Sequence, residues 1–280
     1  MKETMSQVVV RDRSVSLLMY ARVIFALLGR DLAVLKKTAA FFVIRVIMQP
    51  FLFVFVFTYV FPKIGQRVGG GGSKEVEFST LLVAGVVGIS IIFQAIQAVA
   101  LPLVQEFGFT KEIEDRALAP MPAWGLAVEK ILSGAIQAIF AGIVVFPIVL
   151  FVPATAVHLQ INWILLITLV PLAAIVSGTL GLTIGTWIPP TQVPLIFAII
   201  VLPITFLGAV YYPWASLTPI PWLKDIVLVN PLVYINEGLR AALTTGVPHM
   251  NMTYVYIALL VFTIVLGAVS IKGLQKRVVG

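Results

Sequence analysis

The chain has 280 residues, of which 60% are hydrophobic and only 11% are charged, and its mean hydropathy is +1.06. These values exclude a soluble domain and indicate a membrane protein with several spans. The net charge of +7 is modest, and the basic residues gather near the ends of apolar segments, which gives no indication of a nucleic-acid groove. Cysteine is absent, which excludes disulfides, thiolate metal sites and cysteine nucleophiles.

The first apolar segment, residues 14–37, carries a basic stripe. Its cations recur at helical spacing among leucines and phenylalanines: Arg22, Arg30, Lys36 and Lys37. Such a helix suits the headgroup layer on the cytoplasmic side, where basic side chains meet anionic lipid. A spanning helix would instead place Arg22, Arg30 and Asp31 in hydrocarbon, at roughly a few kcal/mol each. We therefore expect residues 1–40 to form a cytoplasmic tail and an interfacial elbow helix.

Six later segments are apolar and long enough to cross a bilayer. They cover residues 41–61, 78–103, 126–152, 163–187, 193–210 and 253–271. The sequence therefore predicts an all-helical, polytopic membrane domain over residues 41–280.

Polar side chains form a stripe on the second predicted span. Ser90, Gln94 and Gln97 are spaced i, i+4, i+7, so they share one helix face, and the third span adds Gln137. Two interpretations stay open: these residues line a substrate path, or they form hydrogen bonds between packed helices.

The fourth predicted span contains three small residues spaced four apart: Ser177, Gly181 and Gly185. Small residues at this spacing allow a neighbouring helix to approach closely. The run predicts helix packing, either within the chain or between subunits.

One charged run, residues 105–124, lies between two apolar blocks. It alternates charged and apolar side chains and then reaches two prolines, which indicates a short surface helix with one apolar side. Its polar residues are Glu106, Thr110, Lys111, Glu112, Glu114, Asp115 and Arg116. The run either docks a partner protein or is only a solvated connection.

The span pattern breaks over residues 211–246, which contain four prolines and apolar pieces too short to cross a bilayer. Asn230 followed by Pro231 is typical of a helix start, and Glu237 and Arg240 can pair at i, i+3. The segment also contains several tyrosines and tryptophans, which favour the headgroup layer. We expect a broken, partly re-entrant element whose marked residues are Tyr212, Trp214, Trp222, Asn230, Pro231, Tyr234, Glu237 and Arg240.

The distribution of lysine and arginine predicts the orientation. Most of them lie on the side of both termini and of residues 105–124, so we expect that side to be cytoplasmic and residues 211–246 to be extracellular. The two histidines are far apart, no acidic residue lies in the middle of a span, and no stretch fits a Walker A motif. The sequence therefore indicates no catalytic residue, no metal site and no ATP site in this chain.

These features together resemble the permease subunit of the type 2 ABC exporters, a group that contains drug-resistance, lipid and polysaccharide exporters. The likeness extends over nearly the whole length. It rests on the basic elbow, on the run E-I-E-D-R-A-L-A-P at residues 112–120, and on N-P-L-x-Y-x-x-x-x-L-R at residues 230–240.

The resemblance implies that the elbow and the 105–124 run bind separate ATPase subunits, with the run as coupling helix, and that residues 211–246 cap the outer end of the pathway. ATP and Mg²⁺ would belong to those ATPase subunits. Two permease chains, identical or closely related, would assemble with two ATPases in the cell membrane and export an amphiphilic drug, lipid or lipid-linked glycan. The alternative is a membrane-embedded, lipid-acting enzyme or scaffold without an ATPase partner.

Overall fold

The computed structural model describes residues 17–64, 78–110, 122–154, 157 and 159–279. The described chain is helical and contains no strand. Its first half comprises α1 (Leu17–Lys37), α2 (Ala39–Val54), the π-helical η1 (Phe55–Val60), α3 (Phe61–Lys63), α4 (Phe78–Gln105), the π-helical η2 (Glu106–Thr110) and α6 (Ala123–Phe151). Its second half comprises α7 (Trp163–Trp187), η3 (Pro190–Gln192), α8 (Val193–Phe206), η4 (Trp214–Leu217), α9 (Pro221–Ile226), η5 (Val227–Val229), α10 (Pro231–Leu243) and α11 (Met252–Val279).

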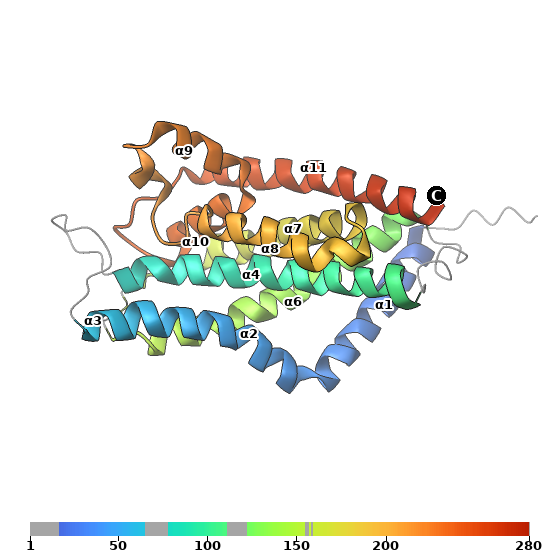
Figure 1. Ribbon diagram of the computed structural model, residues 1–280, viewed down its shortest axis with the longest axis horizontal. Helices are drawn as coiled ribbons and strands as arrows, with labels where there is room; N and C mark the ends of the chain where they lie inside the picture. The colour runs from blue at the N-terminus through green and yellow to red at the C-terminus, as the bar shows by residue number, and fades with distance from the viewer. Residues whose placement is uncertain (1–16, 65–77, 111–121, 155–156, 158, 280) are drawn as a thin grey trace, which may run out of the picture.

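The long helices lie side by side along the longest axis of the molecule (Figure 1). Five stretches of the described chain are long and apolar enough to cross a membrane: Ala39–Val60, Phe78–Gly108, Ala123–Phe151, Trp163–Trp187 and Met252–Arg277. They coincide with five of the six predicted spans, which confirms the all-helical, polytopic fold. In Figure 1, α3 and α9 lie at one end of this bundle, whereas α1 and the last turns of α11 lie at the other.

The fifth predicted span, residues 193–210, is shorter than expected. Only Val193–Phe206 is α-helical, and 14 residues rise about 21 Å, less than the roughly 30 Å of a hydrocarbon core. The chain then turns, with Ala209 in the left-handed region at a φ of 53°. The chain can turn here within an apolar sequence because side chains of α10 bind the backbone carbonyls of the turn, as described below.

The expected break over residues 211–246 is present. The segments Pro221–Val229 and Pro231–Leu243 meet at an angle of 97°, and together they are the one further candidate for a span in the described chain. Asn230 lies at the bend, where its side chain accepts a hydrogen bond from the backbone N–H of Leu232 and caps α10. The predicted helix start at Asn230 and Pro231 is therefore confirmed.

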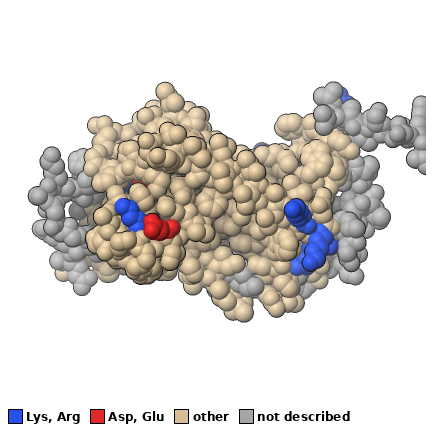
Figure 2. Space-filling model, turned by 90° about the horizontal axis from the view of Figure 1, so that it is seen from above, with Lys and Arg blue, Asp and Glu red and all other residues tan. Residues whose placement is uncertain are grey.

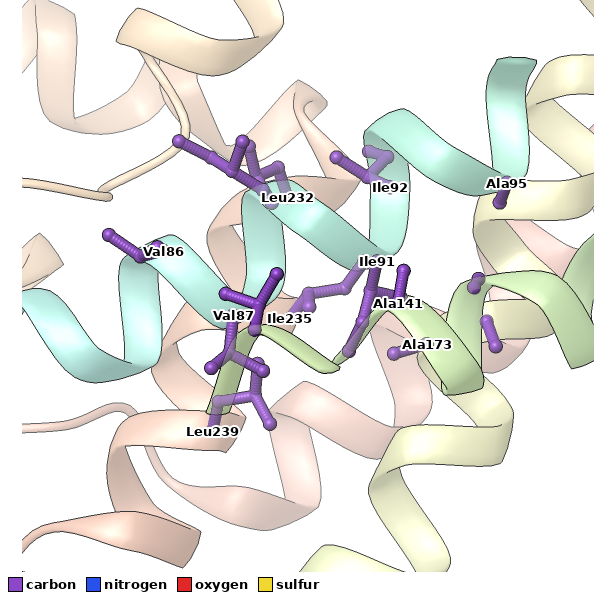
Figure 3. Packing of buried hydrophobic residues seen from close by; sticks show 14 of the residues in the cluster. Val86, Val87, Ile91, Ile92, Ala95, Ala141, Ala173, Leu232, Ile235 and Leu239 are labelled. Carbon is purple, nitrogen blue, oxygen red and sulfur yellow. The ribbon is translucent and has the colours of Figure 1, made fainter. Parts of the chain in front are cut away.

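Helix α4 is the centre of the bundle. In its most apolar window 78% of the residues are buried, compared with 22% for the span that contains α2 and 17% for α11, so the last two present most of their surface outward. Figure 3 shows side chains of α4 packed against α6, α7 and α10: Val87, Ile91, Ala141, Ala173, Ile235 and Leu239. Burial of this apolar surface stabilises the arrangement of the four helices.

The small residues of α7 face α4. A Cβ atom added to Gly181 would lie 2.9 Å from Cα of Ile96, and one added to Gly185 would lie 2.8 Å from Cδ1 of Leu103. Only glycine permits this approach of two helices, which is the packing that the spacing of small residues predicts. The run therefore serves packing within the chain.

Charged residues gather at the two ends of the molecule. Figure 2 shows them there, while the surface between the ends is almost entirely tan in this view. Helix α1 extends at one end and meets α2 at Thr38, so that the two helices form a V in Figure 1. α1 is not among the candidate spans of the described chain, and Arg22, Arg30, Lys36 and Lys37 are all exposed on it.

Candidate functional site

An ion pair between Glu237 and Arg240 holds the broken element together. Both side chains are 0% exposed, and Nη1 of Arg240 lies 2.6 Å from Oε1 of Glu237. The same oxygen accepts the backbone N–H of Trp214 at 2.8 Å, and Oε2 accepts that of Met250 at 2.7 Å. The pair predicted at i, i+3 is confirmed, and it ties α10 to η4 and to the segment before α11.

Three side chains of the 230–240 motif also fasten the end of α8, by donating hydrogen bonds to backbone carbonyls. The bonds are Asn230 Nδ2 to Ile204 at 2.7 Å, Asn236 Nδ2 to Gly208 at 2.7 Å and Arg240 Nη2 to Ala209 at 2.9 Å. A buried carbonyl without a donor is costly, so these bonds allow the chain to turn inside an apolar layer. Asn236 is a structural position of this element that the sequence analysis missed.

The other predicted residues of this element have unequal surroundings. Tyr234 donates its hydroxyl hydrogen bond to the Leu228 carbonyl at 3.1 Å, and the Trp214 indole donates to the Lys224 carbonyl at 3.0 Å. Tyr212 is half-buried, and burial raises the pKa of its hydroxyl. Trp222 is 65% exposed. Tyr234 and Trp214 therefore stabilise the element, whereas the side chain of Trp222 lies mostly on the surface of the chain.

A second polar group lies at the opposite end of the bundle, and we call it the elbow cluster: Arg30 and Asp31 of α1, Glu106 of η2, and Glu129, Lys130 and Ser133 of α6. Nζ of Lys130 lies 2.7 Å from Oε1 of Glu106, and these side chains are only 6% and 10% exposed. Ser133 donates to Asp31 at 2.9 Å, and Arg30 pairs with Asp31 at 3.1 Å. The elbow cluster therefore links the elbow helix, α6 and the end of α4.

Asp31 stays ionised in this cluster. Burial alone would raise the pKa of its carboxyl group, but hydrogen bonds from Ser133 and Arg30, the charge of Lys130 and a hydrogen bond with Glu129 together hold that pKa below its ordinary value. Glu129 is 0% exposed. A buried charge network of this kind is costly to disturb by removing one member, because the remaining charges lose their compensation.

The predicted coupling run, residues 105–124, is described only at its two ends. Glu106 lies in the buried pair with Lys130, so its carboxylate faces the protein, and Thr110 ends η2. The remaining coupling residues lie outside the described residues: Lys111, Glu112, Glu114, Asp115 and Arg116. Their role stays a prediction.

Two pockets adjoin along α2 and α4. The larger, about 370 Å³, lies between α1, α2, α4 and α6, and Gln137 lines it together with members of the elbow cluster. The smaller, about 40 Å³, lies between α2 and α4, and Ser90, Gln94 and Gln97 line it. Arg45 of α2 belongs to both linings. The four residues predicted for a substrate path therefore line two pockets that share Arg45, and their use as a path stays a prediction.

The fold and these sites define a multi-span helical membrane protein with a broken, internally fastened element at one end and a buried charge cluster at the other. Residues 22–244 match the model of the ABC-2 type transporter family, and the chain belongs to this family. It is therefore a permease subunit of an ABC transporter, the kind of chain that works with an ABC ATPase.

Relatives that are named transport permeases are consistent with this family. The inner membrane transport permease YadH of Escherichia coli strain K12 is 26% identical over 238 residues, which cover 83% of this chain and 88% of the relative. The proteins of the same name from Escherichia coli O157:H7 and Shigella flexneri match to the same extent.

Proposed function

We propose that this chain is the permease of an exporter that moves an amphiphilic substrate, a drug, a lipid or a lipid-linked glycan, outward from the cytoplasm or the inner leaflet. The observation that carries the proposal is the larger pocket. One wall of it is apolar, from Val34, Leu35 and Phe42, and another is polar, from Ser133 and Gln137. A hollow with both kinds of wall suits a molecule that has both kinds of surface.

The energy for transport would come from ATP and Mg²⁺ bound by separate ATPase subunits, with the 105–124 run as the coupling helix. The geometry of its base supports this role. α4 continues without interruption as η2 to Thr110, and Lys130 anchors η2 to α6 through Glu106. A force applied to the run would therefore act on the core of the bundle.

For the assembly, we propose two permease chains, identical or closely related, with two ATPases in the inner membrane. The outward-facing apolar surfaces of α2 and α11 are compatible with lipid and with a second chain. Both termini would lie in the cytoplasm. Basic side chains in the last turns of α1 and α11 support this orientation: Lys36, Lys37, Lys276 and Arg277.

Charge reversal in the coupling run tests the function. We expect the variant with Glu112→Lys, Glu114→Lys and Asp115→Lys to lose the ATPase during co-purification and to lose substrate-stimulated ATP hydrolysis, while the permease stays folded, because exposed charges contribute little to its own stability.

A matched control carries three reversals on the predicted outer side: Glu75→Lys, Glu77→Lys and Asp225→Lys. It should keep the ATPase. Equal co-purification and equal ATP hydrolysis in both variants would refute the coupling role. Purification of the wild-type chain without any ATPase would instead favour the lipid-acting enzyme or scaffold.

A further inference from the structure

Arg45 is the charged residue of the two adjoining pockets that has no partner of opposite charge in the described chain. The other charged residues of the larger pocket form two pairs, Arg30 with Asp31 at 3.1 Å and Lys130 with Glu106 at 2.7 Å. The smaller pocket has no other charged residue in its lining. The hollow space therefore carries one uncompensated positive charge, at the point where the two pockets meet.

The hydrogen-bonding capacity of Arg45 is largely unused. Its guanidinium donates a single long bond, from Nη2 to Oε1 of Gln94 at 3.5 Å, and it lies 5.9 Å from the ring centroid of Phe42. A guanidinium offers five N–H donors in a planar fork. Most of these donors remain available to a ligand.

Gln94 adds a second unused donor. Its side chain is only 5% exposed, and its buried Nε2 has no hydrogen-bond partner in the described chain. The orientation of the amide follows from its neighbour, because turning it over would place Nε2 against the donors of Arg45. A buried donor without an acceptor is unfavourable, so this position calls for an acceptor-rich group.

The position of Arg45 in α2 indicates where such a group would come from. Arg45 lies six residues after Ala39, the first residue of α2, which is about 9 Å along the axis and close to the headgroup layer. Large apolar side chains around it face outward, with exposed fractions of 71% for Phe41, 58% for Ile44 and 53% for Met48. This face of α2 is therefore suited to contact with acyl chains.

We propose that the junction of the two pockets binds the phosphate of a membrane phospholipid. Arg45 and Nε2 of Gln94 donate to the phosphate oxygens, the headgroup occupies the larger pocket, and an acyl chain lies along Phe41, Ile44 and Met48. Arginine matches the geometry of a phosphate with two parallel hydrogen bonds, which a lysine at the same place does not reproduce. This site shares the larger pocket with the substrate of the proposed function, but its binding can be measured on the permease chain alone, independently of the direction of transport and of the ATPase.

The test is a binding titration with a soluble phospholipid. The purified full chain in a neutral maltoside detergent is titrated with dioctanoyl phosphatidylglycerol, and the dissociation constant is measured by thermophoresis. We expect Arg45→Gln to weaken binding about tenfold or more, Gln94→Leu to weaken it several-fold, and Arg45→Lys to fall between Arg45→Gln and the wild type. The matched control Lys63→Gln removes an exposed cation of α3 that lines neither pocket and lies outside the basic elbow, and it should bind as the wild type does.

Two further titrations separate the lipid from other sources of the same chemistry. Dioctanoylglycerol, which lacks the phosphate, should bind more weakly, and Arg45→Gln should leave its dissociation constant unchanged. Glycerol phosphate should bind far more weakly than the phospholipid. If glycerol phosphate binds as tightly as the phospholipid, the site is one for soluble anions and the lipid proposal is wrong.

Folding is checked for each variant by gel filtration and by its melting temperature. Arg45 is exposed and makes only one long hydrogen bond, so Arg45→Gln should elute and melt as the wild type does. Phospholipid binding that is equal in the wild type and in folded Arg45→Gln, or that falls equally in Lys63→Gln, would overturn the proposal.

Discussion

Replacing Arg240 by methionine should destabilise the protein strongly through the broken element. The change leaves the carboxylate of Glu237 at 0% exposure without its cation, although the backbone N–H groups of Trp214 and Met250 still donate to it. Breaking a buried ion pair costs about 3–5 kcal/mol, and two remaining donors favour the lower end of that range. Loss of the hydrogen bond to the Ala209 carbonyl adds about 1 kcal/mol, which gives a total of about 4 kcal/mol.

The measurement is the melting temperature of the purified chain in detergent, followed by tryptophan fluorescence. A loss of 4 kcal/mol corresponds to a decrease of about 10 °C for a chain of this size. Lys63→Met, which removes an exposed cation at the same end, should change the melting temperature by at most about 2 °C. The double variant Glu237→Leu with Arg240→Met should recover part of the loss, because it removes the uncompensated charge. Equal melting temperatures of Arg240→Met and Lys63→Met would refute the structural role of the pair.

Two other predictions concern the packing and the orientation. Gly181→Ala should destabilise the chain by about 1–3 kcal/mol, because the new Cβ would lie 2.9 Å from a backbone atom of α4. The control Gly267→Ala, whose new Cβ meets nothing within 4 Å, should leave the stability unchanged. Equal melting temperatures of the two variants would contradict the packing of α7 on α4. Thr218→Cys in this cysteine-free chain should react with an impermeant thiol reagent added to intact cells and Gln275→Cys should not, whereas the opposite labelling would reverse the proposed orientation.

Local features of the fold were predictable from the sequence. The bend at Asn230 and the pair of Glu237 with Arg240 involve residues at most three positions apart, and both are present. Spacing alone determines such contacts, because a helix brings i and i+3 together wherever it lies. The five long spans were predictable for a similar reason, since the hydropathy of a segment reflects its own composition.

Contacts between distant segments were not predictable in this way. The early end of α8 depends on Asn236 and Arg240, which bind carbonyls 28 and 31 residues before them. The elbow cluster joins Asp31 to Ser133 across 102 residues. Hydropathy shows neither contact, and for that reason residues 193–210 resembled a full span and Glu106 resembled a surface residue.

The close packing of α4 limits how this permease can move. Its 28 residues extend about 42 Å. Along that length, glycines allow other segments to approach so closely that an added Cβ atom would clash: Gly85 of α4 beside Val210, Gly134 of α6 beside Val99 of α4, and Gly181 of α7 beside Ile96 of α4. A helix held at so many points can neither bend nor slide past its neighbours without a clash. We therefore expect a displacement applied where α4 meets η2 to reach the broken element, with α4, α6, α7 and α10 moving together as one unit.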